Sequence, residues 1–515
     1  MAQSATPTFA ARWARAVGVA GDHTFLVWED SDATTSSWSY SEFDEIVRGV
    51  ARTLIDLGTR AGDSVHVALT NSPTFVAIWL AAVRLGARFV PCDPHATTPE
   101  IALQLDRVKP RAAVASVRRT DAYLAAKGSS DMPLFLVDED DIELAALLAQ
   151  PIDRGGLPEP DPLDPAAVMF TSGTTSLPKG VVVTQANYAF AGDAMAAAAG
   201  LRPSDRQIVA LPLFHANAQY YSFAAAISVG ASVALMNTFS ASRFLSQAAR
   251  HGATHASLFA APMRMILAKN PPQPPDLRLR HVWFAQDLSA GQYERLCDLF
   301  GCRPRQLYGM TETMPAVLTS NIADAAPDCI GSPTPGCAVR LAAVPDQPRA
   351  GGFEVGELQI GGRRGVELFL GYLDDESTTE ASFAGEWFRT GDLAWRDDDG
   401  LYHFAGRRGD VLKVSGENVS LPEVEAVLAE HPGVFEVAVV GRPDPVRDEV
   451  PVAYVVPAVA RPTTVAELTE WCAGRLAPAK RPRDYTFVDE LPRTSVGKIR
   501  KFLLKERPAH LDDAT

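Results

Sequence analysis

The fold is decided by the stretch Thr171-Ser172-Gly173-Thr174-Thr175-Ser176-Leu177-Pro178-Lys179-Gly180, which directly follows an apolar run at 166–170. A strand that enters a loop of small hydroxyl residues and glycine exposes several backbone N–H donors, and a lysine adds a mobile positive charge. The stretch therefore predicts a phosphate cradle made by Thr171, Ser172, Gly173, Thr174, Thr175 and Lys179. It departs from the Walker pattern, because Lys179 precedes Gly180 instead of serine or threonine. Taken alone, the same composition also fits a polar surface loop.

Short apolar runs alternate with helical stretches on both sides of this loop. The expected strands are 65–69, 88–91, 112–115, 207–211, 233–236 and 281–285, and the expected helices are 73–85, 99–108 and 242–251. Such alternation predicts βαβ units with parallel strands. A segment rich in proline and aspartate at 151–165 is a predicted linker, so the alternation indicates two α/β lobes.

The pattern changes past residue 409. Short strands are expected at 411–414, 435–440 and 452–456, with helices starting after Ser420 and spanning 464–476. Ser420 and Glu423 form a capping-box pattern, and Pro422 suits a first helical turn. We therefore expect an α/β protein with a large multi-lobed N-terminal domain at 1–408, containing two mixed or parallel sheets and a small β subdomain. A small mobile α+β domain is expected at 409–515.

The composition is that of a large folded protein, with 515 residues, 47% hydrophobic and 21% charged. The net charge of −14 is spread without long single-sign blocks, which argues against a nucleic-acid partner. The six cysteines contain no C-x-x-C pair, so neither a disulfide framework nor a zinc site is indicated. No apolar run approaches 18 residues, so we expect no integral membrane segment and a cytoplasmic location.

Five further motifs follow the phosphate loop in order. They are Leu211-Pro212-Leu213-Phe214-His215, Tyr308-Gly309-Met310-Thr311-Glu312, Thr390-Gly391-Asp392, the segment from Gly406-Arg407 through Gly416-Glu417-Asn418, and Pro492-Arg493-Thr494-Ser495-Val496-Gly497-Lys498. Together these motifs resemble those of the adenylate-forming superfamily, which includes acyl-CoA synthetases, peptide-synthetase adenylation domains and firefly luciferase. The segments 284–289, 411–424 and 447–449 are most similar to the crotonobetaine/carnitine-CoA ligase group.

The resemblance implies a nucleotide site with several named contacts. Tyr308, with Gly309 and Met310, would lie against adenine, Thr311 would donate to the phosphate, and Glu312 would hold Mg²⁺. A hard cation prefers carboxylate oxygen, which suits this glutamate. On its own, the same motif also fits a turn before a capped helix.

Two more residues are matched to the ribose. The resemblance implies that Asp392 accepts hydrogen bonds from the ribose hydroxyls and that Arg407 reaches the same sugar. Alone, Asp392 also fits a turn-forming aspartate and Arg407 a solvated charge.

Two lysines and a histidine carry the implied chemistry. Lys498 would bridge the carboxylate and the α-phosphate during adenylation, because a cation there stabilises the transition state. The loop carrying Lys413, Gly416 and Glu417 would enter the site for the second step, in which a thiol attacks the acyl-adenylate. The family rotates its small domain between these two poses, and the matched hinge position is Gly409. His215 would position groups at the junction of the acyl pocket and the CoA tunnel, although a core histidine is the alternative.

One stretch departs from the family pattern. At 284–288 most relatives carry a Gly-Ala-Ala-Pro-like sequence against adenine and the acyl group, whereas this chain has Gln286 and Asp287. Their polar bulk predicts either an unusual acid or a different hold on ATP. We assign both residues to the nucleotide-binding wall.

The resulting hypothesis is an ATP-dependent acyl-CoA ligase that uses ATP, coenzyme A and Mg²⁺. It would convert a small-molecule carboxylic acid to acyl-AMP and pyrophosphate, and would then transfer the acyl group to CoA. A second hypothesis is a half-reaction enzyme that uses a preformed acyl-adenylate, and a third is a non-catalytic adenylate binder. The sequence leaves open whether the acceptor is a separate acyl carrier protein and whether two chains form a homodimer.

Overall fold

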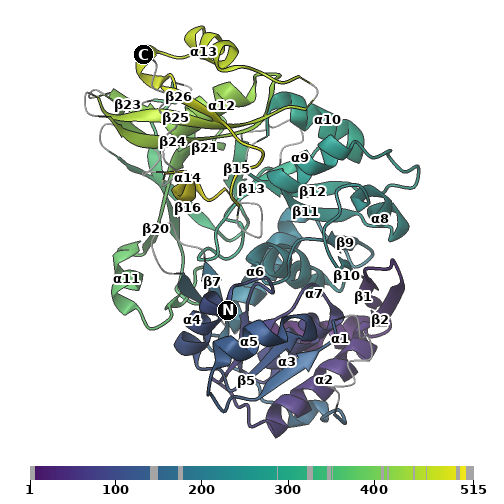
Figure 1. Ribbon diagram of the computed structural model, residues 1–515. Helices are drawn as coiled ribbons and strands as arrows, with labels where there is room; N and C mark the ends of the chain where they lie inside the picture. Colours follow the sequence, from purple (N-terminus) through teal and green to yellow (C-terminus); the bar gives the residue numbers. More distant parts are fainter. Residues whose placement is uncertain are drawn as a thin grey trace.

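A computed structural model of the chain describes residues 6–139, 149–171, 178–286, 288–321, 329–344, 349–350, 352–407, 411–414, 417–444, 447–459, 461–493 and 499–505. In Figure 1 the N-terminal lobe lies at the bottom, the second α/β lobe at the right and the C-terminal region at the top. None of the helices in these ranges is long and apolar enough to cross a membrane.

The N-terminal lobe is built on a seven-stranded sheet in the order β18-β8-β7-β4-β3-β5-β6. Its strands are β3 Ser64–Ala68, β4 Arg88–Pro91, β5 Ala112–Ser116, β6 Leu134–Val137, β7 Pro165–Thr171, β8 Lys179–Thr184 and β18 Gly371–Tyr372. Its helices are α2 Tyr40–Asp56, α3 Pro73–Arg84, α4 Thr98–Val108 and α5 Thr120–Lys127, with the short turns η1 Val117–Arg119 and η2 Arg154–Gly156. The strands β7, β4, β3, β5 and β6 pair in parallel, as the βαβ pattern predicts.

The second sheet has 14 strands and continues through the predicted β subdomain, so that subdomain is not a separate sheet. Its order is β16-β17-β20-β21-β15-β14-β13-β12-β11-β9-β10-β1-β2, with β19 paired to β20. The strands are β1 Thr24–Glu29, β2 Thr35–Ser39, β9 Arg206–Val209, β10 Ser232–Met236, β11 His255–Phe259, β12 His281–Ala285, β13 Arg305–Tyr308, β14 Leu318–Thr319, β15 Cys329–Pro333, β16 Ala338–Ala343, β17 Gly356–Gly361, β19 Phe383–Ala384, β20 Trp387–Arg396 and β21 Tyr402–Arg407. The helices that accompany it are α8 Phe244–Arg250, α9 Ala260–Lys269, α10 Ala290–Phe300 and α11 Glu376–Ala381.

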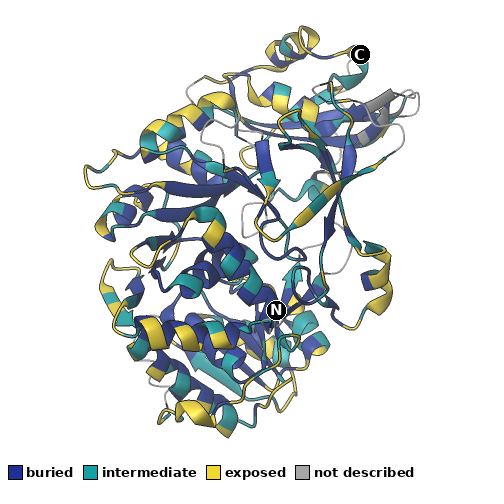
Figure 2. Ribbon diagram, turned by 180° about the vertical axis from the view of Figure 1, so that it is seen from behind, coloured by how far each residue is buried: buried dark blue, intermediate teal, exposed yellow. Residues whose placement is uncertain are grey.

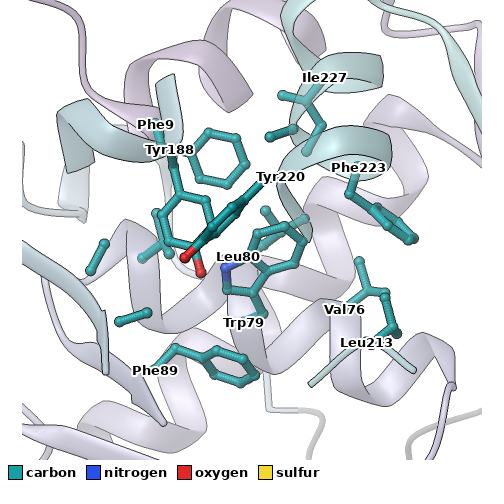
Figure 3. Packing of buried hydrophobic residues seen from close by; sticks show 14 of the residues in the cluster. Phe9, Val76, Trp79, Leu80, Phe89, Tyr188, Leu213, Tyr220, Phe223 and Ile227 are labelled. Carbon is teal, nitrogen blue, oxygen red and sulfur yellow. The ribbon is translucent and has the colours of Figure 1, made fainter. Parts of the chain in front are cut away.

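A layer of helices separates the two sheets. It contains α1 Phe9–Ala20, α6 Gln185–Ala199, the π-helix η3 Asn217–Ala224 and α7 Ala225–Val229. Aromatic side chains from this layer meet α3, and Figure 3 shows Phe9, Trp79, Tyr188 and Tyr220 packed together. Their ring centroids lie 5.1–5.5 Å apart, which is the separation of favourable aromatic pairs. In Figure 2 burial is concentrated in the strands and this central layer, with exposed residues on the outer helix faces.

The C-terminal region forms a separate five-stranded sheet in the order β23-β22-β25-β24, with β26 beside β25. Its elements are β22 Val411–Val414, β23 Glu417–Ser420, α12 Leu421–Ala429, β24 Val434–Asp444, β25 Asp448–Pro457, α13 Val465–Ala473, η5 Pro478–Lys480, β26 Asp484–Phe487 and α14 Lys501–Lys505. The buried apolar clusters of this region draw only on residues from 412 onward, and those of the rest of the chain stop at 404.

The helix that follows Ser420 corrects one local prediction. The Ser420 side chain accepts a hydrogen bond from the Glu423 backbone N–H, as an N-cap should. The Glu423 carboxylate does not return to Ser420, because it pairs with the Lys480 ammonium at 2.6 and 2.7 Å. The capping box is therefore half formed. The pair between Glu423 and Lys480 links α12 to η5.

Candidate active site

Three predicted nucleotide residues converge at the meeting point of β13, β20 and β21. Asp392 and Arg407 face each other in register on the paired strands β20 and β21, and Tyr308 ends β13. The Tyr308 hydroxyl donates to Asp392 Oδ2 at 2.7 Å, and Arg407 Nε lies 2.8 Å from Asp392 Oδ1. Burial, and then the nearby Asp392 carboxylate, raise the pKa of Tyr308 well above its usual value, so its hydroxyl remains a donor. A carboxylate oxygen accepts more than one hydrogen bond, so Asp392 keeps capacity for sugar hydroxyls.

The glycine after Tyr308 is required by a close approach. A Cβ at Gly309 would lie 2.8 Å from the Tyr221 hydroxyl oxygen and 2.9 Å from Ala316 Cα. Any larger residue would collide with the Ala316 backbone and with the Tyr221 hydroxyl. The next residue, Met310, packs against the apolar core of the N-terminal lobes, and its backbone N–H donates to Thr313 Oγ1 at 3.0 Å. Thr311 lies in the turn between them.

Glu312 is the residue that best suits a hard cation. Its side chain is buried, with 6% of the residue exposed, and the Tyr372 hydroxyl donates to its Oε1 at 3.0 Å. Burial, and then Glu312, raise the pKa of Tyr372, which keeps that donor protonated. Within the described residues there is no cluster of three or more metal-ligating side chains. One carboxylate fits the way Mg²⁺ is held beside a nucleotide, since the phosphates and water supply its other oxygens.

The base of the predicted phosphate loop is the β7–β8 hairpin. Thr171 faces Lys179 across these antiparallel strands, and its hydroxyl donates to the Lys179 carbonyl at 3.4 Å. The Lys179 ammonium lies 4.7 Å from the centre of the Tyr372 ring, and Tyr372 in turn reaches Glu312. The predicted lysine and the predicted metal ligand are therefore linked through one tyrosine.

His215 lies after β9, in the turn that leads into η3. Burial lowers its pKa to about 4, against a smaller opposing effect of Asp93. The imidazole is therefore neutral at pH 7. Its turn is fastened by Asn71, whose amide donates to the Leu211 carbonyl at 3.0 Å and accepts from the Leu213 backbone N–H at 2.8 Å.

The departing stretch at 284–288 begins where β12 ends. Gln286 has a left-handed backbone, with φ of 77°, an uncommon conformation for a residue other than glycine. The Gln306 amide donates to the Gln286 carbonyl at 3.1 Å, which holds this turn at the end of the parallel strands. Ligands commonly bind at that edge of such sheets.

Several predicted residues lie outside the described residues. These are Ser172, Gly173, Thr174, Thr175, Asp287, Gly409, Gly416 and Lys498. Lys413 and Glu417 are described through their backbone alone, which pairs Lys413 with Asn418 and Val414 with Glu417 in the β22–β23 hairpin.

Sequence reasoning missed three residues that shape the site: Tyr372, Asn71 and Arg107. Arg107 donates to the Pro178 carbonyl at 2.7 Å and to the Leu373 carbonyl at 3.0 Å, so it ties α4 to the end of the phosphate loop and to the residue that follows β18. An arginine within a helical pattern does not indicate which distant carbonyls its side chain will contact. Tyr372 follows Gly371 at the end of an apolar stretch, and that context alone does not mark it as a site residue.

Described residues of the C-terminal region contact the rest of the molecule at Glu436 and at Pro422. Arg264 Nη2 on α9 lies 3.0 Å from Glu436 Oε1 on β24, and Arg493 pairs with the other oxygen of the same carboxylate. Pro422 approaches Gly406, where a Cβ would lie 2.8 Å from the proline ring. Gly406 has a φ of 105°, so glycine is required there on both grounds.

Comparison with known proteins gives matches over most of the chain. The model of the AMP-binding enzyme family matches residues 13–373, and that of the AMP-binding enzyme C-terminal domain matches residues 423–498. A crotonobetaine/carnitine–CoA ligase of Escherichia fergusonii is 32% identical over 511 residues, covering 96% of this chain and 98% of that protein. The predicted likeness to that ligase group is confirmed.

Solved structures give the same result. The anthranilate CoA ligase AuaEII in complex with anthranoyl-AMP is 26% identical with a TM-score of 0.87, covering 97% of each chain. The O-succinylbenzoate coenzyme A synthetase of Bacillus subtilis in complex with ATP and magnesium ion is 27% identical with a TM-score of 0.83, covering 97% of this chain and 99% of that one. The predicted fold class, a large N-terminal α/β domain with a small C-terminal one, is confirmed.

These matches cover both parts of the chain and agree with the convergence of nucleotide motifs around Asp392 and Glu312. The ligase hypothesis is therefore confirmed, and its cofactors are ATP, coenzyme A and Mg²⁺. The chain belongs to the AMP-binding enzyme family, as an ATP-dependent acid–thiol ligase that forms acyl-CoA through an acyl-adenylate.

Proposed function

We propose that the Tyr308–Asp392–Arg407 cluster is the ribose seat of this acyl-CoA ligase. The observation that carries the proposal is the convergence of a tyrosine hydroxyl and a guanidinium on one buried carboxylate, at 2.7 and 2.8 Å. These contacts order the Asp392 carboxylate before ATP binds, so binding loses little conformational entropy at this side chain. Gly309 and Met310 continue the same strand end and would line the adenine side, with Gln286 and Asp287 on the opposite wall.

The phosphate end of ATP would lie between the β7–β8 hairpin and Glu312. Lys179 and the loop residues 171–175 would bind phosphate oxygens, Thr311 would donate to the α-phosphate, and Glu312 would hold Mg²⁺. The bound cation would neutralise phosphate charge when present. The Tyr372 hydroxyl orients the Glu312 carboxylate, which supports this arrangement.

Two lysines would serve the two half-reactions. In the first, the acid carboxylate attacks the α-phosphorus, the bond to the β-phosphate oxygen breaks, and pyrophosphate leaves. Lys498 would bridge the attacking and phosphoryl oxygens in that transition state. In the second, the CoA thiolate attacks the acyl carbon and AMP leaves. Lys413, Gly416 and Glu417 would line the site for that step.

A domain boundary at 408/409 and a hinge at Gly409 would let these lysines alternate. The separation of the apolar cores between 404 and 412 supports the boundary, because each side has its own buried cluster. His215 would position the acyl group as a neutral imidazole.

The acid is proposed to be medium-sized and to carry a polar group. The relatives are named for crotonobetaine, carnitine, anthranilate and O-succinylbenzoate, acids that combine a carboxylate with further polar or aromatic groups. The acceptor is proposed to be CoA, and the location cytoplasmic, which the six free cysteines support. A separate acyl carrier protein is the alternative acceptor, and a homodimer is the alternative to a monomer.

ATP–pyrophosphate exchange over a panel of acids tests this proposal. We expect exchange with at least one acid, and acyl-CoA formation when CoA is added. Thioester formation from a supplied acyl-adenylate, without exchange on any acid, would favour the half-reaction enzyme. Thioester formation on a phosphopantetheinylated carrier protein, but not on CoA, would replace the proposed acceptor.

A further inference from the structure

Asn217 has a buried amide with no hydrogen-bond partner in the part of the chain that the structure describes. The residue is 5% exposed, and neither its Oδ1 nor its Nδ2 has a partner among the described residues. Buried hydroxyl and indole groups in the described part of the chain also lack a partner, but among the amide side chains there Asn217 is the one that lacks a partner at both its oxygen and its nitrogen. A buried donor and acceptor left unpaired lower stability, so such a residue calls for an explanation.

The amide lies beside the nucleotide motif. Asn217 is the first residue of η3, two positions after His215. Tyr221 lies four residues further, on the same side of the helix, and its hydroxyl oxygen would be 2.8 Å from a Cβ at Gly309. The face that carries Asn217 is therefore turned toward the Tyr308–Glu312 motif. π-helical segments occur frequently at functional sites.

Two neighbouring amides, by contrast, do find partners within the chain. Gln219 on the same helix accepts from the Tyr188 hydroxyl at 2.5 Å and donates to the Leu213 carbonyl at 2.7 Å. Gln207 on β9 donates to the Tyr221 and Ser222 carbonyls at 3.3 and 3.1 Å. The Asn217 amide differs from these two amides in having no partner among the described residues, which points to a partner outside the chain.

We propose that Asn217 is a specificity-determining residue that hydrogen-bonds a neutral polar group on the acyl part of the acid. The amide offers one acceptor and one donor group. A hydroxyl or a carboxamide is likewise both a donor and an acceptor, so it can bond to the carbonyl oxygen and to the amino group of Asn217. A carboxylate only accepts and an ammonium only donates, so each would leave half of the amide unpaired. This proposal rests on the ligase reaction and names the class of acid it takes.

The test compares matched acids on the enzyme and on Asn217→Leu. The pairs are 3-hydroxybutanoate with 3-methylbutanoate, 4-hydroxybenzoate with 4-methylbenzoate, and 4-carbamoylbutanoate with 5-methylhexanoate. For at least one pair, we expect kcat/KM in the pyrophosphate-release assay to favour the polar acid. That preference should fall at least about 10-fold in Asn217→Leu, because a site built to hydrogen-bond a substrate rejects analogues that lack the group.

Stability separates this role from a structural one. Asn217→Leu removes two unpaired polar atoms, so we expect its Tm to equal or exceed that of the unmodified enzyme. The matched control is Gln207→Leu, which removes an amide already bonded to the carbonyls of η3. The control should lower Tm and leave the ratio between the paired acids unchanged. If Asn217→Leu does not fold, Asn217→Ala is compared in the same way.

The outcomes are distinct. An unchanged ratio in a folded Asn217 variant, or preference for the apolar acid of every pair in the unmodified enzyme, would overturn the role of Asn217. A fall in Tm without a change of ratio would assign the amide to folding. If no acid, polar or apolar, supports pyrophosphate exchange in the unmodified enzyme, the proposed ligase reaction itself fails. That result is distinguishable from failure of the Asn217 role, because it is measured on the unmodified enzyme.

Discussion

The N-terminal body and the C-terminal region contribute to this enzyme in different ways. In the body, Asp392 and Glu312 are buried, and each is held by a tyrosine hydroxyl at 2.7 or 3.0 Å. The C-terminal region packs on its own core and, among the described residues, contacts the body through Glu436, which pairs with Arg264, and through Pro422. A nucleotide site used in both half-reactions benefits from pre-organisation, whereas the C-terminal region, which we propose serves one step at a time, benefits from few contacts with the body.

The largest expected effect is on the rate of adenylation, and it tests the proposed role of the C-terminal region. Lys498→Ala should slow acyl-adenylate formation about 10²-fold or more, the scale for losing one electrostatic group aimed at a transition state. Thioester formation from a supplied acyl-adenylate and CoA should survive. Pyrophosphate exchange measures the first step, and thiol consumption measures the second.

Lys413→Ala is the matched variant for the second step. It should still form acyl-adenylate but should fail to convert it to acyl-CoA. Equal loss of both half-reactions in both lysine variants would contradict the division of labour between the two poses.

On the body side, Glu312→Ala should reduce adenylation about 10²-fold, since removing a metal-holding carboxylate removes electrostatic stabilisation at the phosphates. The required Mg²⁺ concentration should rise. Tyr372→Phe keeps Glu312 but removes the 3.0 Å hydrogen bond to it, so a smaller loss in the same direction is expected. Titration of activity with Mg²⁺ checks both, and an unchanged requirement in Glu312→Ala would remove this residue from the metal site.

The ribose seat should give a smaller effect, confined to nucleotide binding. Asp392→Asn should raise the KM for ATP by about 10-fold, because it weakens charge-assisted hydrogen bonds. Asp397→Asn is a suitable control: Asp397 follows β20 and pairs with His403 at 3.0 Å, away from the cluster. A similar KM change in both variants would mean that Asp392 acts through folding of the β20–β21 hairpin.

The sequence predicted the fold well where periodicity is strong. The strands at 88–91, 281–285 and 411–414 match β4, β12 and β22. It did not predict that β14–β17 and β19–β21 would join the second lobe in one sheet. That continuity depends on antiparallel pairings between segments distant in the chain, such as β15 with β21, and no local pattern encodes them.

In the site, only the residues that belong to sequence motifs could be predicted. The convergence of Tyr308, Asp392 and Arg407 follows from their motifs, although 84 positions separate the first two. Tyr372 and Arg107 belong to no sequence motif. Their roles depend on hydrogen bonds to residues distant in the sequence, Glu312 and Pro178 respectively. The failed half of the capping box has the same cause, since Lys480 lies 57 positions from Glu423 and competes for its carboxylate.

The contact between the two regions should give a few-fold effect. Arg264→Ala and Glu436→Gln each remove the same ion pair, whose side chains are largely buried at 14% and 8% exposure. If the pair stabilises one of the two poses, each variant should change the ratio of adenylation to thiolation rates by about 2- to 10-fold. The double variant should show no change beyond that of Glu436→Gln, which removes the pair with Arg493 as well. Additive effects would mean that the pair does not act as a unit.

The smallest expected effect concerns His215, on the body side. Burial holds its pKa at about 4, so the imidazole is neutral throughout pH 5.5–8 and kcat/KM should show no inflection that His215→Gln removes. Stability should nevertheless depend on pH. Because the folded pKa is below the ordinary value of about 6.5, the unfolded chain binds the proton first as the pH falls. The stabilisation is fully present above about pH 6.5 and is lost between there and about pH 4, by at most about 1.4 kcal/mol per pH unit. Denaturant unfolding of the enzyme and of His215→Gln from pH 7.5 to 4.5 measures this difference. A stability difference that stays constant over that range would show that His215 is not held neutral, and an activity inflection near pH 6.5 that the variant loses would make it a proton carrier rather than a positioning group.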